Sequence, residues 1–245
     1  MEGNKVLSKR EGRRSLTASI KRRQGEGRFP VISEIKVRSD KEGDLLRGRD
    51  PVRLAKEMAR LPVAGISVVT EPEHFGGHMD LLRAIAAAVD VPVLHKDFIT
   101  SARQIRESAD CGASAVLLIA AMLGTEQLIC LVDEARSQGL ETLVEVHTIE
   151  EMGKMACLEF DLMGINNRDI TIYETDDGNV DRTETLAAAC RRDRPLISES
   201  SIHHAGEVRR VGRSGADAVL IGTAVLKSEC MAGFLSELIG VGWPV

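Results

Sequence analysis

Eight short apolar runs, separated by amphipathic stretches, follow one another along this chain from residue 31 onward. Several runs are rich in β-branched residues and apolar at nearly every position, which is typical of parallel strands covered on both faces. The runs are Val31–Lys36, Gly65–Thr70, Val91–Asp97, Ala115–Ala120, Thr142–His147, Leu162–Asn167, Pro195–Ser200 and Ala218–Thr223. A chain of 245 residues with eight such runs has the length and the strand number of one eight-unit barrel.

The stretches between the runs carry helix signals. Asp50 and Pro51 supply an N-cap and a proline at the first helical position, and Ser101 and Gln104 have the spacing of a capping box. Alternating strands and helices without a Gly/Ser-rich linker favour one α/β domain. We therefore predict a single (β/α)8 TIM barrel over residues 31–245. A doubly wound open sheet is the alternative, but it usually has fewer strands or a glycine-rich first turn, and the chain has no GxGxxG or Walker-type loop.

Residues 1–30 form a short basic N-terminal extension, with nine Lys and Arg against three Glu. Such a run is most simply a solvated arm or helix. The other interpretation is that part of the extension folds near an anionic substrate. The whole chain has a formal net charge of -5, so we expect no nucleic-acid partner.

The cysteines and the apolar runs indicate where the protein works. Five cysteines are scattered singly, which favours a reducing compartment over a disulfide framework. The longest apolar run, Ala115–Leu123, is too short to span a membrane, and residues 1–30 contain no apolar signal-peptide core. We expect a cytoplasmic protein with no membrane partner and take a monomer as the default. The five cysteines are Cys111, Cys130, Cys157, Cys190 and Cys230.

Charged and polar residues end several of the apolar runs. The C-terminal ends of the strands carry the chemistry in barrels of this class, and a buried charge is costly unless it faces a partner or a polar cavity. We therefore predict that these side chains converge on one active site. They are Glu34 and Lys36 on the first run, Lys96 on the third, Glu145 on the fifth, Asn166 on the sixth and Glu199 on the seventh.

Small residues end the seventh and eighth runs. Ser200 and Ser201 follow Glu199, and Gly222 and Thr223 follow Ile221. The loops after strands seven and eight are the usual phosphate site of such barrels, because backbone N–H groups can approach an anion there. We predict a phosphate-binding site at these four residues.

Several motifs, in order and coherently spaced between about residues 30 and 226, resemble the indole-3-glycerol-phosphate synthase family of tryptophan biosynthesis. The matching segments include Glu34-Ile35-Lys36-x-x-Ser39, Pro92-Val93-Leu94-x-Lys96-Asp97-Phe98, Leu143-Val144-Glu145-Val146, Gly164-Ile165-Asn166-Asn167-Arg168-Asp169 and Ser198-Glu199-Ser200. The resemblance implies a carboxy-lyase that closes 1-(2-carboxyphenylamino)-1-deoxyribulose 5-phosphate into indole-3-glycerol phosphate, with loss of carbon dioxide and water. No cofactor and no metal are implied.

The resemblance also implies roles for individual residues. Lys96 matches the acid at the substrate carbonyl oxygen, Glu145 matches the base, and Lys36 holds the substrate and shares the acid work. Residues that orient the lysine and the substrate are Glu34, Asn166 and Glu199. Substrate-binding residues are Ser39, Phe75, Phe98, Leu117 and Arg168. The residues between His74 and His78 are typical of a loop, so we do not expect the two histidines to bind zinc from one face of a helix.

The sequence departs from this family at two loops. Ser201 stands where the family usually has glycine, and Asp40-Lys41 replaces the usual Pro-Ser after Ser39. We expect negative φ at Ser201, with its hydroxyl as an additional phosphate ligand.

Two other functions stay open. A phosphoribosyl isomerase is also a phosphate-binding barrel, but it commonly uses paired Asp or Cys groups rather than the lysines found here. A barrel that binds a phosphorylated ligand without catalysis is the non-enzymatic alternative.

Overall fold

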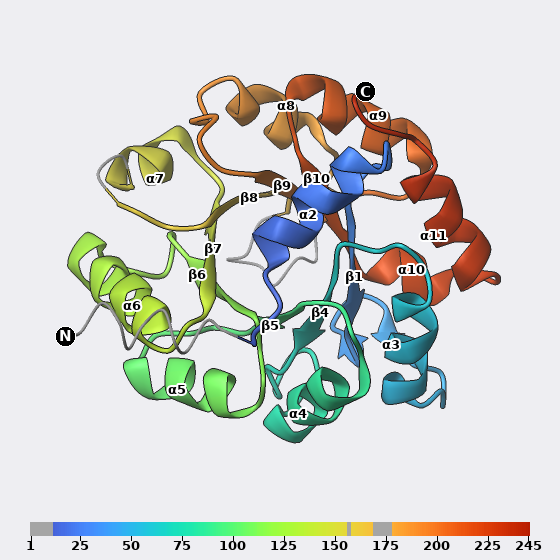
Figure 1. The fold of residues 1–245 in the computed structure, drawn as a ribbon, viewed down its shortest axis with the longest axis horizontal. Coiled ribbons are helices and arrows are strands. Elements are labelled where there is room, and N and C mark those ends of the chain that lie inside the picture. Colours follow the sequence, from blue (N-terminus) through green and yellow to red (C-terminus); the bar gives the residue numbers. More distant parts are fainter. Residues whose placement is uncertain (1–11, 156–157, 169–177) are drawn as a thin grey trace.

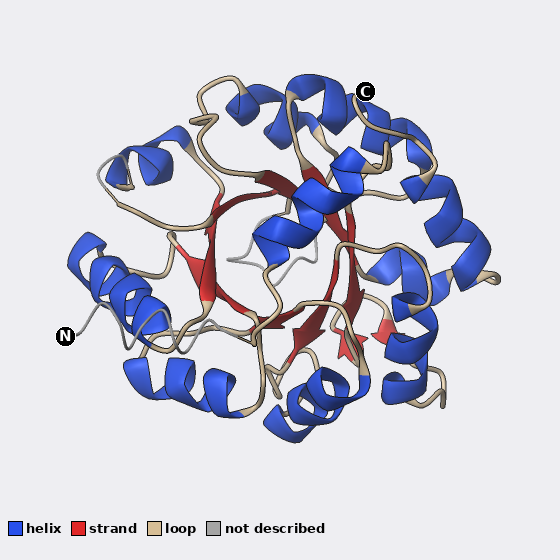
Figure 2. Cartoon of the chain, in the orientation of Figure 1, coloured by secondary structure: helices blue, strands red, loops and turns tan. Residues whose placement is uncertain are grey.

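The computed structural model describes residues 12–155, 158–168 and 178–245 and contains a closed barrel of eight parallel strands. Around the barrel the strands follow the order β1-β10-β9-β8-β7-β6-β5-β4, and they form the central ring in Figure 2. Their bounds are β1 Val31–Ile35, β4 Gly65–Val69, β5 Val93–Lys96, β6 Ala115–Ile119, β7 Glu141–Val146, β8 Leu162–Asn166, β9 Leu196–Glu199 and β10 Ala218–Ile221. Each predicted run coincides with one strand, β7 beginning one residue before its run, so the predicted TIM barrel is confirmed.

Helices surround this ring (Figure 1). Their bounds are α2 Leu16–Gly25, α3 Pro51–Ala59, α4 Met79–Ala88, α5 Ala102–Asp110, α6 Thr125–Ser137, α7 Ile149–Lys154, α8 Asp181–Ala187, α9 Ala205–Ser214, α10 Thr223–Lys227 and α11 Met231–Ile239. The predicted helix starts are present: Asp50 accepts a hydrogen bond from the Arg53 N–H, and Ser101 and Gln104 form a capping box. None of the helices in the described ranges is long and apolar enough to cross a membrane.

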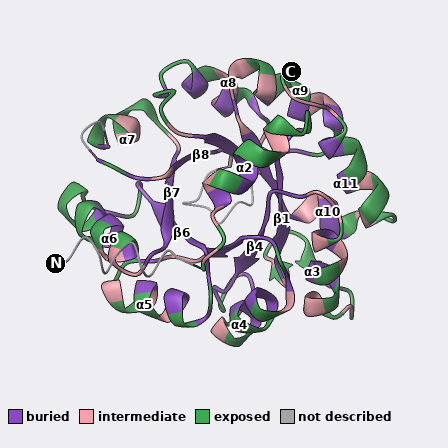
Figure 3. Ribbon diagram, in the orientation of Figure 1, coloured by how far each residue is buried: buried purple, intermediate pink, exposed green. Residues whose placement is uncertain are grey.

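Two packed layers result from the alternation of side chains along each strand. Inward-facing residues such as Leu94, Leu143 and Ile197 fill the barrel interior, and outward-facing residues such as Val68 and Val144 pack against the helices. The strands are therefore buried on both faces (Figure 3), which explains their almost uninterrupted apolar sequence. Cys111, Cys130, Cys190 and Cys230 are free thiols, and Cys157 lies outside the described residues.

Helix α2 closes the end of the barrel at which the strands begin. Its Leu16 and Ile20 are fully buried and belong to the interior cluster. Glu141, the first residue of β7, accepts hydrogen bonds from the backbone N–H groups of Leu16 and Thr17 at 2.6 and 3.2 Å. In Figure 1 the helix lies across the ring of strands.

This position shows that the substrate-side interpretation of the extension is wrong for its described part. Arg23 donates to the Val63 carbonyl just before β4, and Gln24 donates to the Asp217 carbonyl just before β10. The helix is thus held at the end opposite to the predicted site, because its apolar face and its N-terminus find partners there. Residues 1–11 lie outside the described residues, and the domain boundary after residue 30 stays a prediction.

We expect Glu141→Gln to destabilise the protein and leave catalysis unchanged. The buried carboxylate caps α2, and a charged hydrogen-bonding partner of this kind is worth roughly 1–3 kcal/mol. Urea unfolding should show this loss, whereas kcat/KM should stay at the wild-type value. Glu237→Gln, on an exposed face of α11, is the matched control and should change neither. A large drop in kcat/KM at unchanged stability would contradict the assignment of α2 to a purely structural role.

Candidate active site

Buried charges from three strands meet at the end of the barrel at which the strands finish. The Lys96 ammonium on β5 lies 3.3 Å from Glu34 Oε2 and 3.9 Å from Glu199 Oε2. Lys36, just after β1, lies 3.6 Å from Glu34 Oε1. Glu34 therefore bridges two lysines. The structure brings Glu34, Lys36, Lys96 and Glu199 together, as the sequence predicted.

Two glycines, one within β8 and one just after β10, make room for the buried carboxylates of Glu199 and Glu34. A Cβ at Gly222 would lie 2.5 Å from Glu34 Oε1, and a Cβ at Gly164 would overlap Glu199 Oε1. Gly222 has φ -116°, so its lack of a side chain is needed for space rather than for an unusual backbone conformation. The close approach of the Glu34 carboxylate therefore explains the glycine at position 222 without a bound phosphate.

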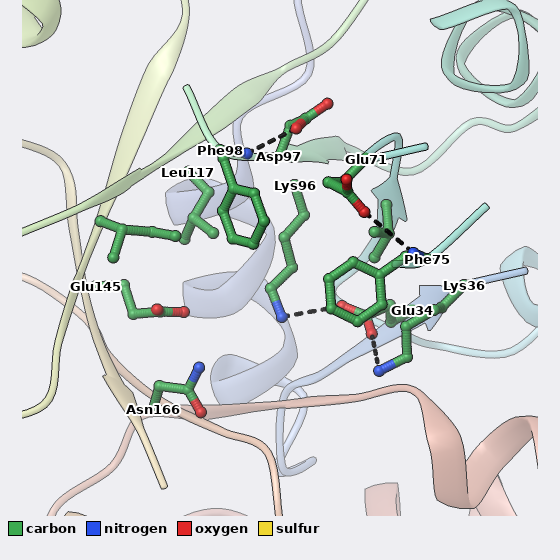
Figure 4. Close-up of a pocket in the computed structure, with 12 residues that line it drawn as sticks. Glu34, Lys36, Glu71, Phe75, Lys96, Asp97, Phe98, Leu117, Glu145 and Asn166 are labelled. Carbon is green, nitrogen blue, oxygen red and sulfur yellow. Dashed lines mark hydrogen bonds and ion pairs between the residues drawn. The ribbon is translucent and has the colours of Figure 1, made fainter. Parts of the chain in front are cut away.

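A cavity of about 380 Å³ opens directly above this cluster. Phe75 and Phe98 form one wall, with ring centroids 6.5 Å apart, and the Lys36 ammonium lies 5.3 Å from the Phe75 centroid. Figure 4 shows Lys96 reaching into the space between this aromatic wall and Glu145. The cavity therefore combines an apolar wall with acidic and basic groups. Leu117, Ile119, Glu145 and Asn166 complete its lining with Val69, Glu71 and Asp97.

A second cavity of about 370 Å³ adjoins the first, and both are lined by Glu34, Lys36 and Lys96. Its remaining lining includes all four residues predicted to bind phosphate, together with Arg168. It also includes Ile202, His203, Leu220, Ile221 and Ala224. One elongated molecule can thus place a ring in the first cavity and an anion in the second, with the two lysines between them.

The backbone of the loop after β9 corrects the expectation of negative φ. Ser200 and Ser201 have φ values of 65° and 56°, in the left-handed region that favours glycine. Asn167 holds this conformation, because its side-chain amide donates to the Glu199 and Ser200 carbonyls at 2.9 and 3.2 Å. The Ser201 hydroxyl is buried and makes no hydrogen bond within the described residues.

Ser39 does not line either cavity. It lies on β2 Arg38–Ser39, which pairs with β3 Gly43–Asp44, and its hydroxyl accepts the Glu42 N–H at 3.1 Å. The same loop carries Asp40, whose carboxylate lies 2.8 Å from His74 Nδ1. The substituted loop is thus joined to the loop after β4, and a role for Ser39 in substrate binding stays a prediction.

Glu71 and Asp97 line the first cavity but were not predicted as site residues. Their carboxylates accept backbone N–H groups of the loops that follow β4 and β5, and the sequence pattern does not reveal these contacts. Both Glu71 oxygens accept backbone N–H groups, those of Glu73, His74 and Phe75, and this fixes the aromatic wall. Burial raises the pKa of Asp97, but hydrogen bonds from His95, Thr70 and the Phe98 N–H together outweigh it and leave the pKa below its ordinary value.

Two of the histidines, His95 and His78, have structural partners. His95 lies 2.7 Å from both the Thr70 and the Ser108 hydroxyls, and His78 accepts the Leu81 N–H at the start of α4. Within the described ranges, the one group of three side chains spaced for a metal ion is Glu71, Glu73 and His74. The hydrogen bonds of Glu71 and the contact of His74 with Asp40 account for this group without an ion.

The barrel, with its lysine–carboxylate cluster at the finishing ends of the strands, defines a (β/α)8-barrel enzyme built for acid–base chemistry. A family model described as "Indole-3-glycerol phosphate synthase" matches residues 3–238. Proteins of that name from Pyrococcus abyssi and Thermococcus kodakarensis are 45% and 44% identical to this chain, over 82% and 86% of it and 86% and 92% of their own lengths. A third, from Halobacterium salinarum, is 40% identical over 87% of this chain and 82% of its own.

This chain belongs to the indole-3-glycerol phosphate synthase family. The match extends into the basic extension, and it covers the strands that carry the lysines and carboxylates. Asp169, part of one of the motifs that first indicated the family, lies outside the described residues.

We expect Ser201→Gly to stabilise the protein by about 1 kcal/mol, because a non-glycine residue in the left-handed region costs roughly that much. The change also removes a buried hydroxyl that makes no hydrogen bond to the described part of the chain. The melting temperature should rise by about 2–4 °C for a chain of this size. Ser214→Gly, at the end of α9, is the control and should lower it, because glycine destabilises a helix. An unchanged or lower melting temperature for Ser201→Gly would contradict the strain inferred at this loop.

Proposed function

We propose that this protein is an indole-3-glycerol-phosphate synthase that closes 1-(2-carboxyphenylamino)-1-deoxyribulose 5-phosphate into indole-3-glycerol phosphate. The observation that carries the proposal is Lys96, whose ammonium lies where the two cavities meet and faces two buried carboxylates. The carboxyphenyl ring would lie in the first cavity, against the wall formed by Phe75 and Phe98 and near Leu117. The phosphate would occupy the second cavity.

The first step forms the carbon–carbon bond. The ring carbon that bears the carboxylate attacks the ketone, and Lys96 gives a proton to the carbonyl oxygen as its π electrons move there. Carbon dioxide then leaves, and the electron pair of the broken bond restores the aromatic ring. The positive charge of Lys96 suits this step, because negative charge develops on the oxygen in the transition state.

The second step is a dehydration. The new hydroxyl takes a proton from Lys36 and leaves as water, while Glu145 removes a proton from the adjacent CH2 group and the carbon–carbon double bond of indole forms. The two steps use two protons at oxygen and return one to Glu145, so each turnover takes up one proton from solvent. General acid–base work of this kind typically contributes about 10²–10⁴-fold in rate.

The remaining residues would hold the lysines and the substrate. Glu34 and Glu199 keep Lys96 directed at the junction, and Lys36 would bind the substrate and assist as an acid. The side-chain oxygen of Asn166 accepts the Arg168 backbone N–H at 3.0 Å. Asn166 would help to orient the lysine and the substrate. The phosphate would be bound by Arg168 and by the backbone at Ser200, Ser201, Gly222 and Thr223, with Ser39 contributing from its loop.

Acid–base groups are sufficient for this reaction, so the proposal includes no metal and no organic cofactor. We further propose that the enzyme works in the cytoplasm as a monomer, with a small phosphorylated molecule as its partner. The scattered single cysteines support a reducing compartment.

We expect Lys96→Met to reduce kcat by about 10²–10⁴-fold, because the proton donor is lost while the length of the side chain is kept. Formation of the indole product, followed by its fluorescence, measures the rate. Lys56→Met, at an exposed position of α3, is the matched control and should leave kcat unchanged. Retention of half the wild-type rate by Lys96→Met would rule out Lys96 as the acid.

The same assay separates the alternatives. The wild-type protein should turn over the carboxyphenylamino ketose and should not isomerise a phosphoribosyl aminoimidazole substrate. Product binding by Lys96→Met, measured by fluorescence titration, shows that the cavity is still folded. Binding of product by the wild-type protein without turnover would support the non-catalytic alternative instead.

We expect dialysis against a strong chelator to leave kcat and KM unchanged, because every proposed step uses protein side chains alone. The control is the same protein assayed after dialysis without chelator. Loss of activity that added zinc or magnesium restores would contradict a metal-independent reaction.

A further inference from the structure

The start of helix α7 places an imidazole between two carboxylates at the edge of the proposed active site. His147 Nε2 lies 3.5 Å from Glu145 Oε1, and His147 Nδ1 lies 3.4 Å from Glu151 Oε2. Both ring nitrogens are buried, and neither makes a hydrogen bond within the described residues. Polar atoms are seldom buried in this way without a reason, so this ring needs an explanation.

Strand periodicity and helix capping together place the ring. His147 directly follows β7 and is two residues after Glu145, so its side chain lies on the same side of the chain as that of Glu145. Thr148 is the N-cap of α7 and accepts the Glu151 N–H at 3.2 Å. The Glu151 side chain reaches back and accepts the backbone N–H of His147 at 2.7 Å. The helix cap therefore fixes both the backbone of His147 and the carboxylate that faces its ring.

The geometry of these contacts is directional. Glu145 is fully buried in the cavity wall, whereas Glu151 is at the rim with 13% of its side chain exposed. An imidazole has one nitrogen on each side, so a ring anchored by Glu151 presents its other nitrogen to Glu145. A base that is aimed by a neighbouring group is a recurring arrangement in acid–base sites.

We propose that His147 is a positioning residue for Glu145, with Glu151 as its anchor. His147 holds the Glu145 carboxylate against the side of the cavity where the CH2 proton of the substrate is removed. This inference rests on the proposed function of Glu145 as the base. His147 touches no substrate in this account and acts only through that carboxylate.

The variants His147→Leu, His147→Gln and Glu151→Gln test the proposal, with Glu150→Gln as the matched control. His147→Leu should lower kcat by about tenfold to a hundredfold, because a misplaced catalytic group costs up to about that much, and KM should change less than about twofold. His147→Gln keeps an N–H near the position of Nε2 and should recover much of the rate. Glu151→Gln should lower kcat to a smaller extent, because the amide oxygen of the glutamine can still accept the backbone N–H of His147.

Glu150 is adjacent to Glu151 and exposed, so Glu150→Gln removes the same charge from the same turn without touching His147. Its kcat should equal that of the wild type. A rise in KM with unchanged kcat for His147→Leu, or an equal loss of kcat in Glu150→Gln and Glu151→Gln, would overturn the proposal. Melting temperatures of all variants verify that each is folded at the assay temperature.

A double-mutant cycle with Glu145→Gln separates positioning from packing. Rates are measured in single turnover with enzyme in excess, so that slow variants can still be followed. If His147 acts through Glu145, His147→Leu should have no further effect once Glu145 is Gln. An equal loss in both backgrounds would overturn the proposal. Wild-type activity of Glu145→Gln would instead refute the base itself, whereas an inactive Glu145→Gln beside a fully active His147→Leu would refute only the positioning role.

Discussion

The carboxylate of Glu34 is the interaction on which the rest of the site depends. It faces Lys36 on one side and Lys96 on the other, accepts the Ser67 hydroxyl at 3.3 Å, and fills the space left by Gly222. Buried charges of this kind add little net stability, because desolvation offsets their attraction, but removal of one partner leaves the others uncompensated. The lysines are therefore held in place by a group that needs the closed barrel around it.

The two ends of the barrel divide the work. At the end where the strands begin, α2 inserts Leu16 and Ile20 into the interior, and Glu141 binds the start of the helix. At the other end the interior stays open, and charged residues replace apolar ones. Because the closed ring buries the middle of every strand, the two ends are separated by a packed layer, and a change at one end need not disturb the other.

The catalytic end carries features that a structure selected for stability alone would not retain. It buries four glutamates beside two lysines, and it holds Ser200 and Ser201 in a conformation that favours glycine. Asn167 and Thr183 hold this loop through a shared hydrogen bond of 3.0 Å, with which the barrel scaffold supports the strained backbone. Strain and buried charge of this sort tend to gather at functional sites, where the surrounding packing over-determines them.

The sequence by itself determined the barrel, its eight strands and the convergence of Glu34, Lys96 and Glu199, because the period of apolar residues and the ends of parallel strands follow from local backbone geometry. The family was also evident from motifs at those strand ends. Only the tertiary structure decided the place of α2 and the positive φ of Ser201. Each of these depends on contacts between residues far apart in sequence, or on a backbone conformation that its neighbours impose, and neither is encoded in local residue pattern.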